Sequence, residues 1–395
     1  MRAEGRRVLA TLVRTTGSWE LAEDAVQDAV VRALETWPRD GVPAEPRAWL
    51  TVTARRRALD VLRREAQRDH KQQEALAMAV PAEPSPDSVV RDDLLRLVFT
   101  CCHPALSAET QVALALRTLA GLSTAETARA LLVPEQVMAK RLTRAKQKVR
   151  QAGIPYRVPA DHELPQRLRG VAATVYLLFN EGWAPADGDA LLRPALLDEA
   201  VRLARLLHAL LPDEPTVLGL LSLLLLHDAR RTTRTGPAGR PVLLADQDRS
   251  RWDRALVEEG VLLLGEGLRR TPDRPDPYVV QAALAACHVL ADTAADTDWA
   301  AVCSWYDVLL TVQDTPAVRL AHAVALGERD GARAGLAALE LVAGLDGAAP
   351  LHGARAELLL RDGQRAAAVR AYDAALALPL SAPQRAQLEA RRSQV

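Results

Sequence analysis

Apolar residues recur at helical spacing along most of the chain, and runs that alternate between apolar and polar residues are almost absent. This pattern predicts an all-α protein. One helix is expected over residues 19–37, followed by a loop over residues 38–46, which hold three prolines and a glycine. The apolar stripe of the helix lies at i, i+4, i+7 and i+11 and comprises Val26, Val30, Ala33 and Trp37.

A second helix is expected from Arg47 to about Glu65, again with one apolar side. Its stripe comprises Leu50, Ala54, Ala58 and Val61. Periodicity is lost over residues 66–92, where the stretch VPAEPSPDS has three prolines and no apolar face. We predict a linker here, between two compact helical units.

Residues 93–153 are predicted to form three helices. The break at AGLS offers Ser123 as an N-cap with Glu126 three residues later, which is the capping-box pattern. The next break places Pro134 at the first position of the last helix, where proline is favoured. Two helices joined by a tight turn, the second strongly basic, are typical of a helix-turn-helix.

The rest of the chain is predicted to be Ala- and Leu-rich helix with short loops. Its most apolar run, VLGLLSLLLL at residues 217–226, is too short to span a bilayer and predicts a buried helix. Near the end, small and aromatic residues fall at the offsets of a tetratricopeptide repeat, and Gly331 precedes Gly363 by 32 residues, close to that repeat's period. The matching positions are Ala356, Gly363, Ala368, Tyr372 and Ala375.

Charge divides the chain unevenly, although 50 basic and 50 acidic residues balance overall. Residues 1–155 hold 24 basic and 19 acidic residues, a net charge of +5, and the remainder has a net charge of −5. This asymmetry favours different partners for the two parts. The four cysteines follow no disulfide-scaffold spacing and the first residues lack a signal-peptide pattern, so we expect a cytoplasmic protein.

The last helix of residues 93–153 has one apolar and one cationic face. Lys140, Arg144 and Lys148 recur at i+4 spacing, where like charges repel one another. A phosphate backbone would relieve that repulsion and add attraction by releasing counterions. Polar Glu135 and Gln136 occupy the first turn, where a recognition helix meets base edges. The pattern favours DNA binding, and a solvated helix face is the alternative. The inward stripe comprises Met138, Leu142, Ala145 and Val149.

Two segments upstream carry further candidate surfaces. The first is an acidic patch opposite the apolar stripe of residues 19–37, without a basic partner before Arg32. The second places an aromatic residue and arginines on one helix face, which suits single-stranded nucleic acid. A solvated helix face and a half-buried tryptophan are the alternatives. The first patch comprises Glu23, Asp24, Gln27 and Asp28. The second comprises Trp49, Thr53, Arg56 and Asp60, flanked by Arg55, Arg57, Arg63 and Arg64.

Three stretches, in this order, resemble the extracytoplasmic-function sigma factors, the compact branch of the sigma-70 superfamily. AEDAVQDAVVRAL is similar to the helix of that family that binds the clamp of core RNA polymerase. RAWLTVTARRRALDVLRR is similar to the helix that melts and reads the −10 promoter element. GLSTAETARALLVPEQVMAKRLTRAKQKVR is similar to the helix-turn-helix that docks on the −35 element.

A subgroup of that family carries a long C-terminal extension with tetratricopeptide-like repeats. The stretches FTCCHPALS, GIPYRVP, LFNEGW, LLLLHDARR and DQDRSRWDRA resemble this subgroup, so the resemblance covers nearly the whole chain. It implies a sigma region 2 at residues 1–65, a linker at 66–92, a sigma region 4 at 93–153 and a helical regulatory domain at 156–395.

The resemblance also implies roles for individual residues. The polymerase-binding set is Asp24, Gln27 and Asp28. The set facing the melted −10 strand is Trp49, Thr53, Arg56, Arg57, Asp60 and Arg63, and the loop 38–46 would help to hold a flipped base. The set at the −35 element is Glu135, Gln136, Lys140, Arg141 and Arg144.

No stretch of the sequence indicates catalysis, a cofactor or a bound metal ion. Cys101 and Cys102 are adjacent with His103 beside them, whereas zinc ligands are usually separated by at least two residues. The polar segment 223–255 lacks a nucleophile, a phosphate-binding glycine loop and a metal triad. Its charged residues predict a buried ion-pair network or, alternatively, a peptide or regulator site. They comprise His227, Asp228, Arg230, Asp246, Asp248 and Arg249, together with Trp252.

The sequence therefore predicts a sigma factor whose partners are core RNA polymerase and promoter DNA. We expect no membrane contact, and we expect an intramolecular or protein regulator to act through the C-terminal domain. Two alternatives remain open at this point. One is a helix-turn-helix regulator with a repeat sensor domain that acts without polymerase, and the other is a repeat scaffold with no DNA role.

Overall fold

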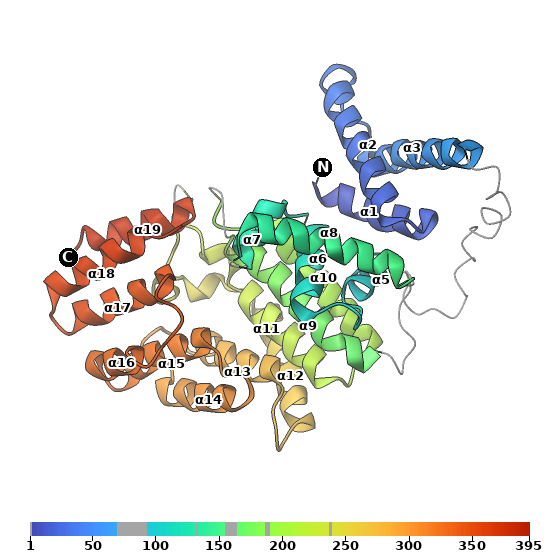
Figure 1. Ribbon diagram of the computed structural model, residues 1–395. Coiled ribbons are helices and arrows are strands. Elements are labelled where there is room, and N and C mark those ends of the chain that lie inside the picture. Colours follow the sequence, from blue (N-terminus) through green and yellow to red (C-terminus); the bar gives the residue numbers. More distant parts are fainter. Residues whose placement is uncertain are drawn as a thin grey trace. The chain divides into compact units, whose positions relative to one another are not determined.

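The structure is a computed structural model that describes residues 2–68, 93–119, 121–131, 133–154, 164–185, 190–236 and 239–395. These ranges form helices, with one isolated bridge between Thr235 and Pro241 and no strand (Figure 1). The predicted all-α class is therefore confirmed. Within the same ranges, each helix is too short or too polar to cross a membrane.

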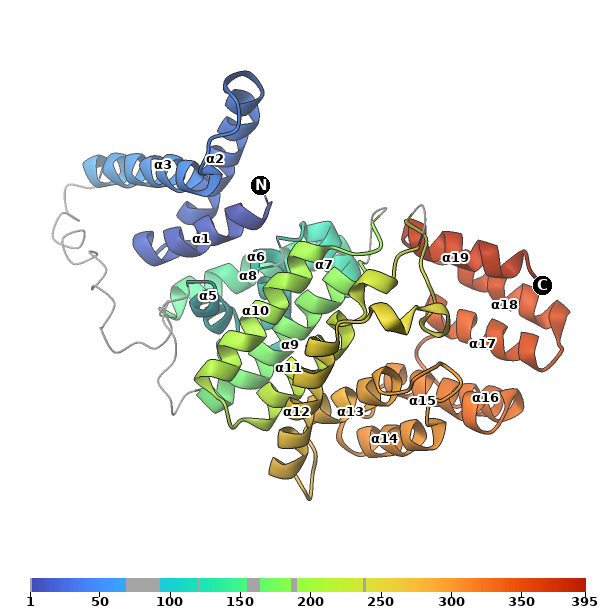
Figure 2. The ribbon, with the colours of Figure 1, turned by 180° about the vertical axis from the view of Figure 1, so that it is seen from behind.

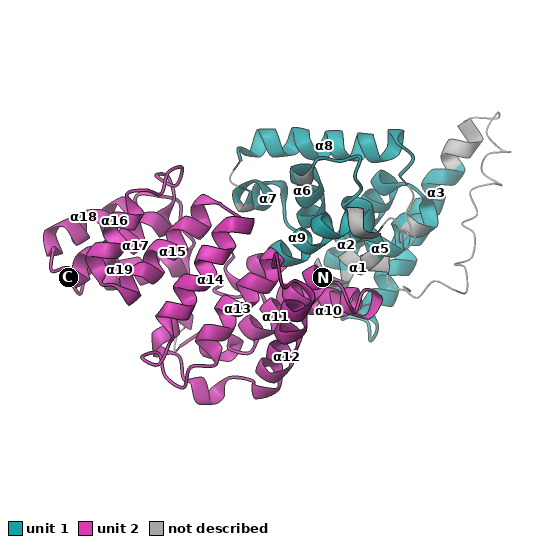
Figure 3. Cartoon of the chain, turned by 90° about the horizontal axis from the view of Figure 1, so that it is seen from below, with its two compact units in different colours: residues 1–178 teal, residues 179–395 magenta. Residues whose placement is uncertain are grey.

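Two compact units divide the chain, residues 1–178 and residues 179–395 (Figure 3). The boundary between the two units lies within the helix α9, Leu164–Trp183. The four predicted domains, residues 1–65, 66–92, 93–153 and 156–395, stay predictions, and most of the predicted linker lies outside the described residues.

The first unit begins with three helices that pack on one another, and α1 also packs against α5. Figures 1 and 2 show α1, α2 and α3 grouped at the N-terminal end. The helix-turn-helix follows, with α6 and α7 both packed against α8. The helices are α1 (Arg2–Thr16), α2 (Trp19–Asp40), α3 (Pro46–Arg68), α5 (Asp93–Cys101), α6 (Ala108–Leu119), α7 (Thr124–Ala130) and α8 (Glu135–Gln151).

The helix α2 is longer than the sequence predicted. The loop was expected to begin at Pro38, yet the helix continues through this proline to Asp40. Gly41 then ends the helix with φ of 83° and donates its N–H to the Trp37 carbonyl at 3.0 Å. Proline removes one helical hydrogen bond, but this end is exposed, so water can bind the carbonyl that loses its partner.

The buried face of α2 also differs from the predicted stripe. Only Ala33 of the four predicted positions is fully buried, and Val26, Val30 and Trp37 are half-buried. Alanine side chains are small and let α2 lie close against α1 and α3, so the helix turns its alanines inward. The residues that bury completely are Trp19, Ala22, Ala25, Ala29 and Ala33.

The apolar stripe of α3 is confirmed. Leu50, Ala54 and Ala58 are buried and Val61 is half-buried. The helix begins at Pro46, one residue before the predicted start, and continues to Arg68. The connection between α2 and α3 is therefore reduced to residues 41–45.

The second unit consists of helices that pack mostly on their neighbours in sequence, an arrangement typical of helical repeat proteins. The described residues between α11 and α12 include the short 3₁₀ helices η2 (Arg231–Thr233), η4 (Leu244–Asp246) and η5 (Arg249–Arg251). The α-helices are α10 (Pro194–Leu210), α11 (Pro215–Asp228), α12 (Arg254–Arg270), α13 (Pro277–Val289), α14 (Trp299–Val312), α15 (Pro316–Arg329), α16 (Ala332–Leu339), α17 (Ala349–Arg361), α18 (Arg365–Leu376) and α19 (Ala382–Arg392).

The helix α11 forms the centre of this unit, as its apolar run predicted. Every residue from Thr216 to Leu226 is buried, and α11 packs against α10, α12 and α13. Gly219 lies against the backbone at the start of α13, where an added Cβ would come within 2.4 Å of the Val279 nitrogen. Ser222 donates its hydroxyl to the Gly260 carbonyl of α12 at 2.7 Å. These two contacts fix how α12 and α13 cross α11.

The predicted repeat positions pack as paired helices. Ala356 of α17 and Ala368, Tyr372 and Ala375 of α18 are fully buried between the two helices. Gly363 turns the chain between them with φ of 80°, and Gly331 has φ of 95° at the turn between α15 and α16. Small residues at these positions let each helix pair close tightly, which agrees with a tetratricopeptide-like arrangement.

Candidate nucleic-acid interface

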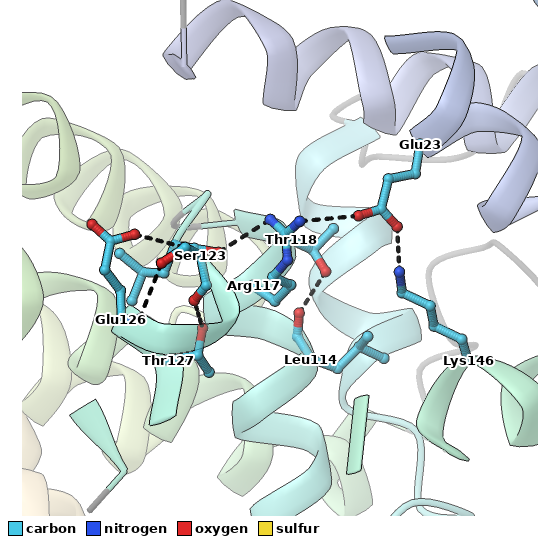
Figure 4. Close-up of polar contacts among 9 residues, drawn as sticks. Glu23, Leu114, Arg117, Thr118, Ser123, Glu126, Thr127 and Lys146 are labelled. Atoms are coloured by element: carbon cyan, nitrogen blue, oxygen red, sulfur yellow. Dashed lines mark hydrogen bonds and ion pairs between the residues drawn. The ribbon is translucent and has the colours of Figure 1, made fainter. Parts of the chain in front are cut away.

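The turn between α6 and α7 is fixed by hydrogen bonds that the sequence predicted (Figure 4). Ser123 Oγ accepts from the Glu126 N–H at 3.1 Å, and Glu126 Oε2 accepts from the Ser123 N–H at 2.6 Å. The capping box is therefore confirmed. Arg117 of α6 adds a bond from Nη1 to the Leu122 carbonyl at 3.1 Å. Together these bonds hold the entry to the helix-turn-helix.

The helix α8 presents the predicted inward face. Met138, Leu142 and Ala145 are buried, and Val149 is half-buried. Pro134 is the N-cap, one residue before the predicted position, and its carbonyl accepts from the N–H of Met138 at 3.1 Å. The polar and charged residues of α8 lie on the opposite side of the helix.

One cationic stripe of α8 remains exposed and without a described counter-charge. Lys140, Arg144 and Lys148 are exposed, and none of them forms an ion pair with a described carboxylate. They line a groove of about 420 Å³ together with Ser107, just before α6, and Thr110, in its first turn. Glu135 and Gln136 are also exposed, in the first turn of α8. This groove is a surface of concentrated positive charge with polar side chains at its rim.

The other three cations of α8 are neutralised. Arg141 pairs with Glu109 of α6 at 3.0 Å, and Arg150 pairs with Glu20 of α2 at 3.1 Å. Lys146 pairs with Glu23, which also accepts from Arg117 at 3.3 Å (Figure 4). The six cations of this helix therefore divide into a paired group and the exposed stripe of Lys140, Arg144 and Lys148.

Within α2 the acidic patch has no basic residue before Arg32, but two of its members pair with cations of other helices. Glu23 is held between Arg117 and Lys146, and Asp28 pairs with Arg57 of α3 at 2.6 Å. Periodicity within one helix gives no sign of such pairs, since Glu23 and Lys146 are 123 positions apart. Sequence reasoning also missed Glu20 and Arg117.

The three residues of the predicted polymerase-binding set lie on the exposed side of α2. Asp24, Gln27 and Asp28 are all exposed. Gln27 also lines a pocket of about 250 Å³ that includes Arg117 and Lys146. The side of α2 that holds this set thus borders helices of the helix-turn-helix.

The predicted −10 set follows one side of α3. Arg56, Arg57, Asp60 and Arg63 are exposed, whereas Thr53 is half-buried. Trp49 is half-buried too, with its ring edge-to-face against Trp37 at a centroid distance of 5.5 Å. Packing against Trp37 fixes the ring and leaves part of it accessible to a partner.

Apolar residues are exposed next to these charges. Solvent reaches about half or more of each of three side chains, Val31 at 53%, Leu34 at 57% and Val42 at 66%. Val52 and Leu59 of α3 are also exposed, at 48% and 41%. These side chains belong to α2, to the connection after it and to α3, and exposed apolar side chains are a feature of protein-binding surfaces.

The cysteines near α5 contribute to packing. Cys101 and Cys102 are buried, and Cys102 Sγ lies 3.4 Å from Thr174 Oγ1 of α9. Burial raises the pKa of Cys102 to about 12 and that of Cys101 well above its usual value. Neither thiol is therefore a ready nucleophile or redox sensor. In the described ranges, no group of histidine, cysteine and carboxylate side chains is placed to hold a metal ion.

Known families match three stretches of the chain. Residues 1–68 match Sigma-70 region 2, residues 96–149 match Sigma-70 region 4, and residues 167–268 match a family of unknown function, DUF6596. An uncharacterized protein of Rhizobium meliloti (strain 1021) is 40% identical over 389 residues, which are 97% of this chain and 92% of that protein. No solved structure matches the chain.

Both sigma matches coincide with the surfaces described above. Region 2 covers α1, α2 and α3, and region 4 covers most of α5 and all of the helix-turn-helix up to Val149. Proteins with these regions are transcription initiation factors rather than enzymes, and they recognise promoter DNA together with core RNA polymerase. The chain therefore belongs to the sigma-70 superfamily, as a sigma factor of the extracytoplasmic-function type with a helical C-terminal extension.

Proposed function

We propose that α8 binds the −35 promoter element, that α3 binds the unpaired −10 strand and that α2 binds core RNA polymerase. The observation that carries the proposal is the exposed stripe of Lys140, Arg144 and Lys148. The other α8 cations are held by carboxylates, so this stripe is the part of the helix left for phosphate. Glu135 and Gln136, in the first turn, and Arg141 complete the predicted −35 set.

On α3, Trp49 is suited to stack with an unpaired base, because its ring is already fixed by Trp37. Each base stacked on an aromatic side chain contributes about 1–3 kcal/mol to single-strand binding. Arg56 and Arg63 stand exposed on the same helix and supply positive charge for the strand backbone. Binding the unpaired strand more tightly than the duplex would favour the open complex.

On α2, the exposed Asp24 and Gln27 lie close to the apolar side chains Val31 and Leu34. A patch of charge beside exposed apolar area suits a specific protein partner, here core polymerase. Glu20 and Glu23 of the same helix are engaged by cations of α6 and α8. We infer that these ion pairs restrain α2 in the free protein and open when polymerase binds.

Replacing Glu23 by glutamine should raise the affinity for core polymerase about fivefold. The substitution removes two ion pairs that we infer must open, and partly exposed pairs contribute roughly 0.2–1 kcal/mol each. Fluorescence titration of labelled protein with core polymerase measures the change. The control is Glu35→Gln on the exposed side of the same helix, which should leave the affinity unaltered. A lower affinity for Glu23→Gln would mean that Glu23 itself contacts polymerase.

The C-terminal domain predicted at residues 156–395 is proposed to regulate the sigma regions, either by masking or by supporting them. The net charge of −5 after residue 155, next to a net charge of +5 before it, motivates this proposal. Promoter-specific transcription by a fragment of residues 1–155 should differ from that of the full chain. Because Thr174 of α9 packs on Cys102, a fragment of residues 1–183 controls for loss of that contact. Equal activity of both fragments and the full chain would refute regulation in vitro.

Gel shifts separate this function from that of a helix-turn-helix regulator. A sigma factor should shift promoter DNA only when core polymerase is present, whereas a regulator should bind duplex DNA unaided. A repeat scaffold should do neither. We expect a shift with the reconstituted holoenzyme and none with the protein alone at the same salt concentration.

A further inference from the structure

The polar segment after α11, predicted to form either a buried ion-pair network or a peptide or regulator site, holds few ion pairs among its described residues. Two of its arginines, Arg230 and Arg234, instead stack on the ring of Trp183, with guanidinium-to-centroid distances of 5.0 and 4.3 Å. Arg234 also donates to the Trp183 carbonyl, and Arg230 donates to His227 Nδ1 at 3.2 Å. The segment's described ion pairs belong to Arg231, which binds Asp228 and Asp198.

Positive charge therefore gathers around Trp183 without a described carboxylate to balance it. Burial and the neighbouring arginines lower the pKa of Arg230 to about 10, and burial lowers that of Arg234 to about 10. The same surroundings lower the pKa of His288 to about 4 and hold that of His227 well below its usual value. Half-buried charges of one sign destabilise a fold unless a counter-charge binds.

A third arginine of this segment, Arg249, has a structural role, because it fixes the loop to the end of α13. Arg249 donates to the carbonyls of His288 and Ala291, the latter at 2.8 Å, and so ties η5 to the end of α13. It also stacks on Trp252, whose Nε1 donates to Thr233 Oγ1 at 2.9 Å. Arg234 has one described backbone acceptor, the Trp183 carbonyl, and Arg230 has none among the described residues, so most of their N–H donors are not used in fixing the loop.

Both arginines line a pocket of about 300 Å³, within the lower range of small-molecule sites. Apolar residues such as Leu191 and Val242 form part of its wall, and Gln384 and Gln387 of α19 line it as well. The start of α19 thus borders the pocket, and the partial positive charge of a helix N-terminus favours anions. One cavity of the second unit is therefore lined by positive charge, by hydrogen-bond donors and by apolar side chains.

We propose that this pocket binds a small organic anion, whose carboxylate or phosphate oxygens are held by Arg230 and Arg234 while its apolar part lies against Leu191 and Val242. Guanidinium groups bind such oxygens in pairs, and their stacking on Trp183 orients them in advance. The amide of Gln387 suits the polar groups of the same ligand, as does Nε2 of Gln384, whose Oε1 accepts from the Ser381 N–H at 3.0 Å. A bound anion would balance charge that no carboxylate of the described residues balances, and would give the C-terminal unit a chemical signal. The inference goes beyond the proposed function, and its test needs neither polymerase nor DNA.

Calorimetric titration of the full chain at constant ionic strength tests the proposal, with inorganic phosphate, succinate and phenyl phosphate as probes. We expect saturable binding of at least one probe, with phenyl phosphate tighter than inorganic phosphate because it also fills the apolar part. A bound probe should raise the unfolding temperature. Tighter binding of succinate than of both phosphates would assign the ligand as a carboxylate and would also support the site.

Variants locate the binding. Arg234→Gln and Arg230→Gln should each weaken the binding of the tightest probe at least tenfold. Arg240→Gln removes the same charge from an exposed position on the same segment and should change binding less than twofold. Each pocket variant should keep or raise the unfolding temperature without an anion, since it relieves repulsion. No saturable binding of any probe at 10 mM, or equal loss in all three variants, would overturn the proposal.

Discussion

Replacement of both Lys140 and Arg144 by alanine is expected to weaken binding of the holoenzyme to promoter DNA by about 10- to 100-fold near physiological salt. Both side chains are exposed on α8, one turn apart, and neither has a described carboxylate partner. Each lost phosphate contact lowers the slope of log affinity against log salt by about 0.9. The double variant should therefore flatten this slope by roughly 1–2, as measured by fluorescence anisotropy over a salt series.

A matched control separates this local effect from a general loss of charge. Arg365 and Arg370 of α18 are exposed and form no described ion pair, so their double replacement by alanine removes the same charge. The control should keep the affinity and the salt slope of the unaltered protein. If the salt slope of the α8 variant is unchanged, or if the control changes equally, Lys140 and Arg144 do not contact the DNA.

Substitution of Gly219 by alanine is expected to destabilise the C-terminal unit by about 2–4 kcal/mol. The new Cβ would lie 2.4 Å from the Val279 nitrogen and 2.7 Å from the Tyr278 carbonyl carbon. Both atoms are backbone, so relief requires α11 and α13 to move apart within a fully buried core. Thermal unfolding followed by circular dichroism should show a midpoint lower by about 5–10 °C.

Gly265 of α12 supplies the control for this substitution. A Cβ there would meet only the end of the Arg269 side chain, at 3.5 Å, which can move aside. Alanine at this position should be neutral or stabilising by up to about 1 kcal/mol, because it is the better helix former. If the Gly219→Ala variant unfolds at the same temperature as the unaltered protein, α11 and α13 do not lie as close together at Gly219 as the structure shows.

Local patterns predicted the parts of the fold that depend on neighbouring residues. The capping box at Ser123 and Glu126, the α3 stripe and the buried α11 each follow from residues within a few turns of one another. Two local expectations were wrong for physical reasons. Pro38 is tolerated in the exposed last turn of α2, and alanines rather than valines form the buried side of that helix, where its neighbours lie close.

Contacts between distant residues could not be predicted from these patterns. The sequence marked six cations on one helix but gave no sign that Arg141, Lys146 and Arg150 pair with carboxylates of other helices. The pocket around Arg230 and Arg234 combines side chains of residues 183–247 with those of α19, so no single segment carries its pattern. Such sites follow from tertiary packing, whereas the −35 and −10 sets rest on helix faces and on the family resemblance and stay predictions.

Run-off transcription with purified core RNA polymerase tests the central claim most directly. Templates are fragments of the source genome, and the 5′ ends of the transcripts are mapped with core polymerase alone and with the full chain added. We expect discrete start sites that appear only with the added protein and share −35 and −10 elements at a fixed spacing. Start sites that do not depend on the protein, together with tight binding to duplex DNA in the absence of polymerase, would contradict it.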